Sequence, residues 1–270
     1  MNTRDTLQSN NSKNIETNIN HDDIKSLIRR TAEKYNDYKY FKDVDPITFP
    51  HHFYDLFKQG KASLQDIEIS GLFAAHLAWG RRDMIVRDTK RLLDEMRWKP
   101  YDYVMRGMSS NCNPSDIVIE GAADYTPEYR SEDKSIHRTI KWCDIAKICS
   151  NLRRFYLENQ SLAILSPAEL RTEIFGQKPD KNAANKKIHM YRRWMVRNDG
   201  LVDLGIWKNI SPKDLIIPLD IHVFNSAQKY NMTKRNNFNI KTALEITEYL
   251  NEIFPGDPTK GDFALFQLDV

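Results

Sequence analysis

The spacing of apolar side chains predicts helices along most of this chain. In residues 182–197, Ala184, Ile188, Tyr191 and Met195 recur at helical spacing, so one stripe of that helix is expected to face a core. Similar patterns predict helices over residues 22–35, 63–80 and 143–157, from residue 81 onward, and over 221–230.

Helix-start signals recur, whereas alternating apolar runs are short and few. Ser166-Pro167 with Glu169 combines an N-cap, a first-turn proline and a third-position glutamate, and Ser211 and Asp257 each precede a proline in the same way. The two prolines in residues 45–52 indicate an extended connection, and residues 115–119 form the one predicted strand. The predicted fold class is mainly α, with ten or so helices.

Composition adds the domain organisation. The chain has 270 residues, 40% of them apolar and 29% charged, which is typical of a soluble globular protein. Residues 1–20 are rich in Asn, Ser and Thr and are expected to form a flexible tail, whereas 21–270 are expected to form a single helical domain. The net charge of +3 is too small to indicate nucleic acid unless the positive charges cluster.

Several classes of protein are disfavoured. Cys112, Cys143 and Cys149 show no CxxC spacing and indicate reduced thiols, not a zinc site or a disulfide framework. The adjacent His51 and His52 favour a structural role over metal binding, so no metal or other cofactor is expected. No apolar run approaches the roughly 18 residues of a membrane helix, and no export signal is evident, so we expect a cytoplasmic protein without a membrane partner.

The strongest functional signal lies between residues 182 and 228. Lys186, Arg193 and Arg197 share a face of the predicted basic helix, and Asp220 follows a proline at the start of the next helix. Backbone N–H groups at a helix start can keep a carboxylate ionised. A cationic helix near a fixed carboxylate predicts a site for a polyanion, although Asp220 could equally be a plain N-cap.

Other candidate residues also have two interpretations. Arg81 and Arg82, at a tight junction between helices, could contact a phosphate backbone or form an ordinary solvated turn. Trp194 could stack on a base or pack in the core. Core positions are expected for Trp79, Trp207 and His76.

Two segments, residues 68–82 and 190–197, resemble an uncharacterised bacterial family classed as a domain of unknown function. Residues 45–51, 217–222 and 262–266 carry the same resemblance. Together these segments cover most of the chain from about Leu27 to its end. The resemblance identifies relatives without identifying an activity.

Pro218-Leu-Asp-Ile-His-Val223 is also similar, more distantly, to the segment that carries the catalytic aspartate in helix-hairpin-helix DNA glycosylases. This resemblance implies an all-α, two-lobed fold with a DNA-binding cleft, in which a base is flipped out and its glycosidic bond is cleaved. Asp220 would take the place of the aspartate. Lys186, 34 positions earlier, would be the Schiff-base lysine, with Lys187 as the adjacent contender. The family's glycine-rich hairpin is missing or divergent here, and three cysteines exclude its iron–sulfur cluster.

The leading hypothesis is therefore a DNA glycosylase-like protein, a possible glycosylase or abasic-site lyase, that acts on or binds damaged DNA. The alternatives are a non-catalytic nucleic-acid-binding protein on the same scaffold and an interaction protein whose basic helix meets an acidic partner. Asp220 and Lys186 are the predicted catalytic residues. The predicted nucleic-acid contacts are Arg81, Arg82, Lys187, Arg193, Arg197 and His222.

Overall fold

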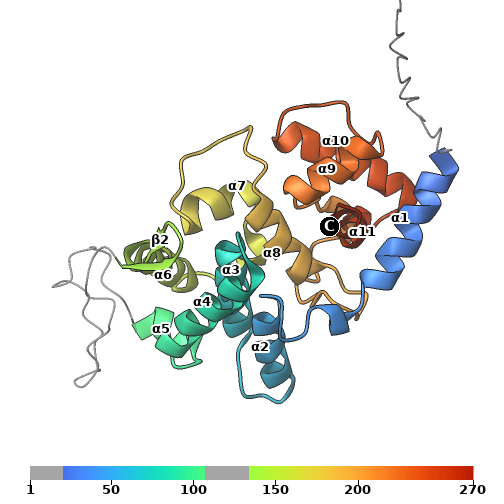
Figure 1. Cartoon of the computed structure of the whole chain (residues 1–270). Helices are drawn as coiled ribbons and strands as arrows, with labels where there is room; N and C mark the ends of the chain where they lie inside the picture. Colours follow the sequence, from blue (N-terminus) through green and yellow to red (C-terminus); the bar gives the residue numbers. More distant parts are fainter. Residues whose placement is uncertain (1–20, 107–133, 270) are drawn as a thin grey trace, which may run out of the picture.

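The computed structural model describes residues 21–106 and 134–269, and helices dominate this part of the chain (Figure 1). Its α-helices are α1 His21–Tyr35, α2 Thr48–Lys58, α3 Leu64–Leu77, α4 Arg82–Glu95, α5 Pro100–Arg106, α6 Trp142–Tyr156, α7 Pro167–Glu169, α8 Lys186–Val196, α9 Ile221–Lys229, α10 Ile240–Ile253 and α11 Asp262–Gln267. Short 3-10 turns are η1 Tyr38–Tyr40, η3 Leu162–Ile164, η5 Pro212–Asp214 and η6 Pro258–Gly261, and η4 Leu170–Ile174 is a π-helical turn. The two strands β1 Ser135–His137 and β2 Ile140–Lys141 pair antiparallel. The mainly α prediction is confirmed.

Buried apolar side chains form two separate clusters. Core A contains residues between Ile47 and Leu215, together with Phe263. Core B contains Ala184, three residues of α1 and residues of α9, α10 and α11. The first helix of the chain therefore packs with the last ones, and Figure 1 shows α1 beside α11.

Helix α8 contributes its buried apolar side chains to core A, and Figure 1 shows it near the centre of the described part of the chain. The predicted stripe is confirmed for Ile188, Tyr191 and Met195, which lie in core A, whereas Ala184 lies in core B and precedes the first residue of the helix. Helix α8 packs closely on α3 at Gly71, where a Cβ atom would lie 2.6 Å from Cε of Met195. The helix begins at Lys186, four residues later than predicted, after Asn185 in a left-handed conformation with φ 46°.

The predicted helix starts are observed where the side chains can cap them. Ser63 and Ser166 form capping boxes with Asp66 and Glu169, and the Asp220 carboxylate caps α9. The start signal at Ser211 leads only to the three-residue turn η5. Helix α3 ends at Leu77, three residues before the predicted glycine stop, and Gly80 has a φ of 96° in the connection to α4.

One prediction of local structure is wrong. Residues 45–52 are not an extended connection, because α2 begins at Thr48 and includes Pro50 in its first turn. A proline is tolerated there since the first N–H groups of a helix have no intrahelical acceptor. The predicted tail 1–20 and strand 115–119 lie outside the described residues.

The histidines expected to be structural have structural partners. Nε2 of His51 is 2.6 Å from the carbonyl oxygen of Val202, and its ring stacks on Tyr38. His76 stacks on Phe175, and burial lowers its pKa to about 3.

Cys143 and Cys149 are free thiols. None of the helices in the described ranges is long and apolar enough to cross a membrane.

Glu68 joins several segments of core A. Its buried carboxylate accepts hydrogen bonds from Tyr156, Ser161, the Leu162 backbone and Trp207. Burial raises its pKa above the ordinary value, although these four donors oppose the shift. A buried carboxylate is tolerated when it is fully hydrogen-bonded, as here.

Glu68→Ala should therefore destabilise the protein by at least about 3 kcal/mol, because several buried donors lose their acceptor at once. Urea unfolding measures this loss. Glu169→Ala, which removes an exposed capping carboxylate of α7, is the matched control and should cost clearly less. Equal losses for the two variants would show that the Glu68 contacts do not stabilise core A.

Candidate functional site

A cavity of about 470 Å³ is lined by residues of both cores. This volume lies within the range of small-molecule sites, and it can hold a nucleoside-sized group. Eight aromatic side chains contribute to its wall, namely Tyr35, Tyr40, Phe41, Trp79, Trp194, Phe238, Phe263 and Phe266. Flat, apolar walls of this kind suit a planar ring.

The charged side chains of the cavity are balanced. Three are cationic and three are carboxylates: Arg82, Lys186 and Arg193, and Asp45, Asp220 and Asp262. The cavity therefore lacks the excess of positive charge that was expected for a polyanion site. Paired charges in an aromatic pocket favour a ligand with few charges and several hydrogen-bonding atoms.

Lys186 and Asp220 meet in this cavity. Nζ of Lys186, in the first residue of α8, lies 3.8 Å from Oδ2 of Asp220. Nζ also donates to the carbonyl oxygen of Ala78 at 3.3 Å. Both side chains are partly exposed, at 29% and 21%, so the pair is accessible to a ligand in the cavity.

The two interpretations of Asp220 are compatible in the structure. Oδ1 caps α9 by accepting a hydrogen bond from the backbone N–H of Val223 at 2.9 Å. Oδ2, the other carboxylate oxygen, is the one nearest to Lys186. The cap fixes the rotamer of the side chain, and thereby holds the second oxygen toward the amine.

Lys187 points elsewhere, although it is the neighbour of Lys186. Its ammonium donates to the carbonyl oxygen of His76 and lies 5.7 Å from the centre of the Trp79 ring. Burial, with a contribution from Lys186, lowers the pKa of Lys187 to about 8. Lys187 is therefore easier to deprotonate than an ordinary lysine, but it does not line the cavity.

Asp45 and Asp262 are cavity residues that sequence reasoning did not select. Oδ1 of Asp45 accepts from the backbone N–H of Ile47 at 3.1 Å, and burial raises its pKa. Burial also raises the pKa of Asp262 to about 6, although Arg193 opposes the shift. Both aspartates lie in the segments that carry the family resemblance, which was the one available signal.

The other predicted contacts lie at different distances from the cavity. Arg82 and His222 line it, and both lie against the ring of Phe266. Nε of Arg82 is 3.7 Å from Asp45, and Nδ1 of His222 is 2.8 Å from Asp269. Arg81 lies outside the wall as an exposed side chain paired with Asp83, so the solvated-turn interpretation of Arg81 stays open.

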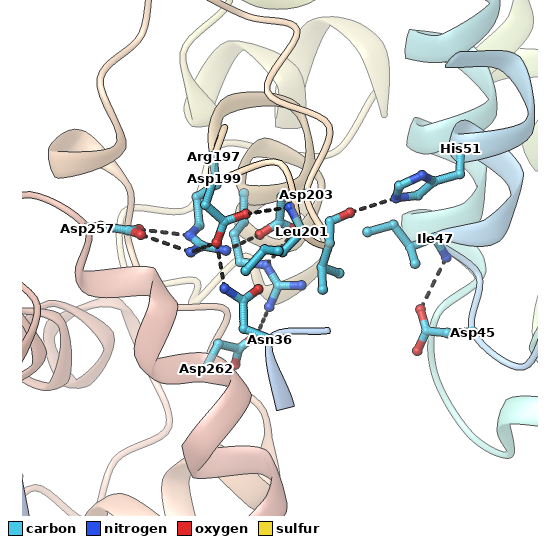
Figure 2. Close-up of polar contacts among 12 residues, drawn as sticks. Asn36, Asp45, Ile47, His51, Arg197, Asp199, Leu201, Asp203, Asp257 and Asp262 are labelled. Atoms are coloured by element: carbon cyan, nitrogen blue, oxygen red, sulfur yellow. Dashed lines mark hydrogen bonds and ion pairs between the residues drawn. The ribbon is translucent and has the colours of Figure 1, made fainter. Parts of the chain in front are cut away.

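Arg193 and Arg197 are not a solvated cationic face. The Arg197 side chain is 1% exposed and forms ion pairs with Asp199, Asp203 and Asp257 (Figure 2). Arg193 is 6% exposed and pairs with Asp203 and Asp262. This corrects the expectation of phosphate contacts at these two residues, because their guanidinium groups already have buried carboxylate partners.

The tryptophans are divided between core and cavity. Trp207 is buried in core A, as expected, and donates to Glu68. Trp194 is 2% exposed, so it belongs to core A, while part of it forms the cavity wall. Trp79 is only partly buried and also lines the cavity, which corrects the expectation of a core position.

The structure describes no group of three or more His, Cys, Asp or Glu side chains that could hold a metal ion within residues 21–106 and 134–269. The titratable side chains that line the cavity include the amine of Lys186, three carboxyl groups and the imidazole of His222.

Comparison with known proteins shows the family. The family model with the description "Protein of unknown function (DUF2400)" matches residues 45–174 and 166–270, and the chain belongs to this family. No curated protein and no solved structure matches the chain. The family identifies no activity, so the function has to be argued from the cavity.

Replacing Arg197 should be severely destabilising near neutral pH. Arg197→Met leaves Asp199 and Asp257 without this cationic partner and the buried Asp203 with Arg193 alone, and such losses cost roughly 3–5 kcal/mol. Burial opposes ionisation of Asp199, but Arg197 and Asn36 outweigh it and keep its pKa below the ordinary value. A lowered carboxyl pKa stabilises the fold above about pH 4 and stops doing so as the pH falls.

The deficit of Arg197→Met, measured by urea unfolding from pH 7 to pH 3.5, should therefore shrink at the acidic end. Arg235→Met, which breaks one exposed pair with Glu245, is the control and should have a small effect throughout. A deficit that is independent of pH would contradict an electrostatic role.

Proposed function

We propose that this protein is a DNA glycosylase-like enzyme with abasic-site lyase chemistry, in which Lys186 attacks the sugar and Asp220 assists it. The observation that carries the proposal is the 3.8 Å approach of the Lys186 amine to the free oxygen of a carboxylate fixed at a helix start. The similarity of residues 218–223 to the aspartate segment of helix-hairpin-helix glycosylases supports the same assignment.

The pair has complementary chemical roles. A lysine becomes nucleophilic only when its amine loses a proton, and Asp220 Oδ2 is the acceptor close enough to take it. The neutral amine then attacks C1′ of the sugar, while Asp220 keeps the proton that it has taken. Lys187 lacks such a carboxylate partner among the contacts described and does not face the cavity.

The surroundings of the pair suit a base that has left the duplex. The aromatic walls can stack on its ring, as sites for flipped bases do. Ile221 and Phe238 line the same cavity and keep 57% and 49% of their surface exposed, so they form an apolar rim around its entrance. Arg82 is 44% exposed at this cavity and is the cation best placed to contact a phosphate.

Borohydride trapping tests the nucleophile directly. On duplexes that contain an abasic site, uracil, hypoxanthine or 8-oxoguanine, the wild-type protein should form a covalent adduct with at least one of them, because the imine is reduced to a stable amine. Lys186→Ala should abolish the adduct, since the attacking nitrogen is gone.

Lys187→Ala is the matched control, because it removes the adjacent lysine, which lies outside the cavity. It should retain the adduct. Loss of the adduct in Lys187→Ala together with its retention in Lys186→Ala would show that Lys187, and not Lys186, is the nucleophile. Wild-type protein that traps none of the four duplexes would refute the lysine mechanism, and salt-dependent DNA binding would then favour the non-catalytic alternative.

Asp220→Asn separates the cap from the charge. Asparagine caps a helix about as well as aspartate, so the thermal midpoint should change little. The rate of adduct formation should nevertheless fall by about 100-fold or more, because the proton acceptor of Lys186 is lost. Asp220→Ala adds a loss of about 1 kcal/mol of stability from the missing cap. An unchanged trapping rate in Asp220→Asn would restrict Asp220 to its structural role.

A further inference from the structure

Asp262 is a third carboxyl group of the cavity with a free oxygen. It is the first residue of α11, and its side chain is 15% exposed. One oxygen, Oδ2, accepts from Nη1 of Arg193. No hydrogen bond within the described residues engages Oδ1, and the residue lines the cavity beside Lys186 and Asp220.

The charged groups around Asp262 come from three directions. Arg193 and Lys186 face it from α8, Asp203 from the loop after α8, and Asp220 from the start of α9. The two cations favour its ionised form, whereas burial and the two carboxylates disfavour it. The balance raises the pKa of Asp262 to about 6, so this carboxyl group can carry a proton close to neutral pH.

The proposed reaction also needs a proton donor for the leaving base, because Asp220 acts as the acceptor of the Lys186 proton. When the glycosidic C–N bond breaks, its electron pair goes to the base, which leaves as an anion unless it is protonated. Both oxygens of Asp220 already have a role in the proposed reaction, because Oδ1 caps α9 and Oδ2 takes the proton of Lys186. Lys186 itself becomes bonded to the sugar.

We infer that Asp262 is the general acid that protonates the leaving base. In the complete step, the Lys186 proton moves to Asp220, Nζ of Lys186 bonds to C1′, and the C1′–N bond breaks toward the base. The base takes the proton of the Asp262 carboxyl group, which ends ionised beside Arg193. The inference rests on the proposed function and adds the residue that releases the base.

The neighbouring side chains suit this role. Phe263 and Phe266 follow Asp262 on α11 and line the same cavity. The guanidinium of Arg193 lies 4.6 Å from the centre of the Phe263 ring while it binds Asp262. One short helix therefore carries both the acid and aromatic surface on which a base can stack.

The test compares base release with trapping on a duplex that has already lost its base. Asp262→Asn keeps the size of the side chain but cannot donate a carboxyl proton. On uracil, hypoxanthine or 8-oxoguanine duplexes that the wild type cleaves, single-turnover base release should fall about 100-fold or more. Borohydride trapping on a preformed abasic duplex should stay within about twofold of wild type, because no base has to leave.

The pH profile provides a readout that a structural role would not change. The Lys186 proton moves within the site, so Asp262 is the group that must be protonated from solvent. Wild-type base release should fall about tenfold per pH unit above the pKa of Asp262, and this limb should be missing in Asp262→Asn. Asp257→Asn, which loses a carboxylate charge from the same ion-pair network outside the cavity, is the control and should keep the wild-type profile.

The outcomes distinguish failure of the Asp262 inference from failure of the proposed function on which it rests. Base release by Asp262→Asn at the wild-type rate would overturn the inference alone. An equal loss of abasic trapping in Asp262→Asn would also overturn the inference, because it would show a structural role. A wild type that traps abasic sites but releases none of the three bases would overturn it as well. A wild type that traps nothing would refute the proposed function, and the role of Asp262 with it.

Discussion

The structure depends on the buried ion pairs at the carboxyl end of α8. Arg193 and Arg197 are held by Asp203 from the following loop and by Asp257 and Asp262 from the end of the chain. Buried charges of this kind are tolerated only when each has its partners, so the contacts specify a geometry more than they add stability. They connect α8 to the segment that begins α11.

This network also explains the electrostatics of the cavity. Arg193 is shared between Asp203, which is fully buried, and Asp262, which reaches the cavity. Because its charge is divided, Arg193 does not fully offset the effect of burial on Asp262, whose pKa stays raised. A structural ion pair on one side of α8 thus sets the protonation of a carboxyl group on the cavity side.

Local signals were predictable from the sequence, and tertiary partners were not. Apolar spacing located α8 and its buried stripe, and cap chemistry located Ser63, Ser166 and Asp220. No local pattern indicated that Arg197 is buried: its partners Asp199 and Asp203 are near in the sequence, but the third, Asp257, lies 60 residues away. Pro50 led to the wrong prediction of an extended connection, because a proline is compatible with a helix when it lies in the first turn. The cavity residues Asp45 and Asp262 stand in no local pattern that marks them.

The contrast between two adjacent lysines shows why position outweighs acidity in this site. Lys187 has a lowered pKa because of its burial, but its amine is directed to the carbonyl oxygen of His76. Lys186 occupies the first position of α8, where the turn at Asn185 leads the chain past the cavity. A step of about 100° around the helix therefore separates the buried amine of Lys187 from the amine of Lys186, which lines the cavity. In the proposed mechanism, the carboxylate of Asp220 takes the proton of Lys186, so this amine does not depend on burial to lose its proton.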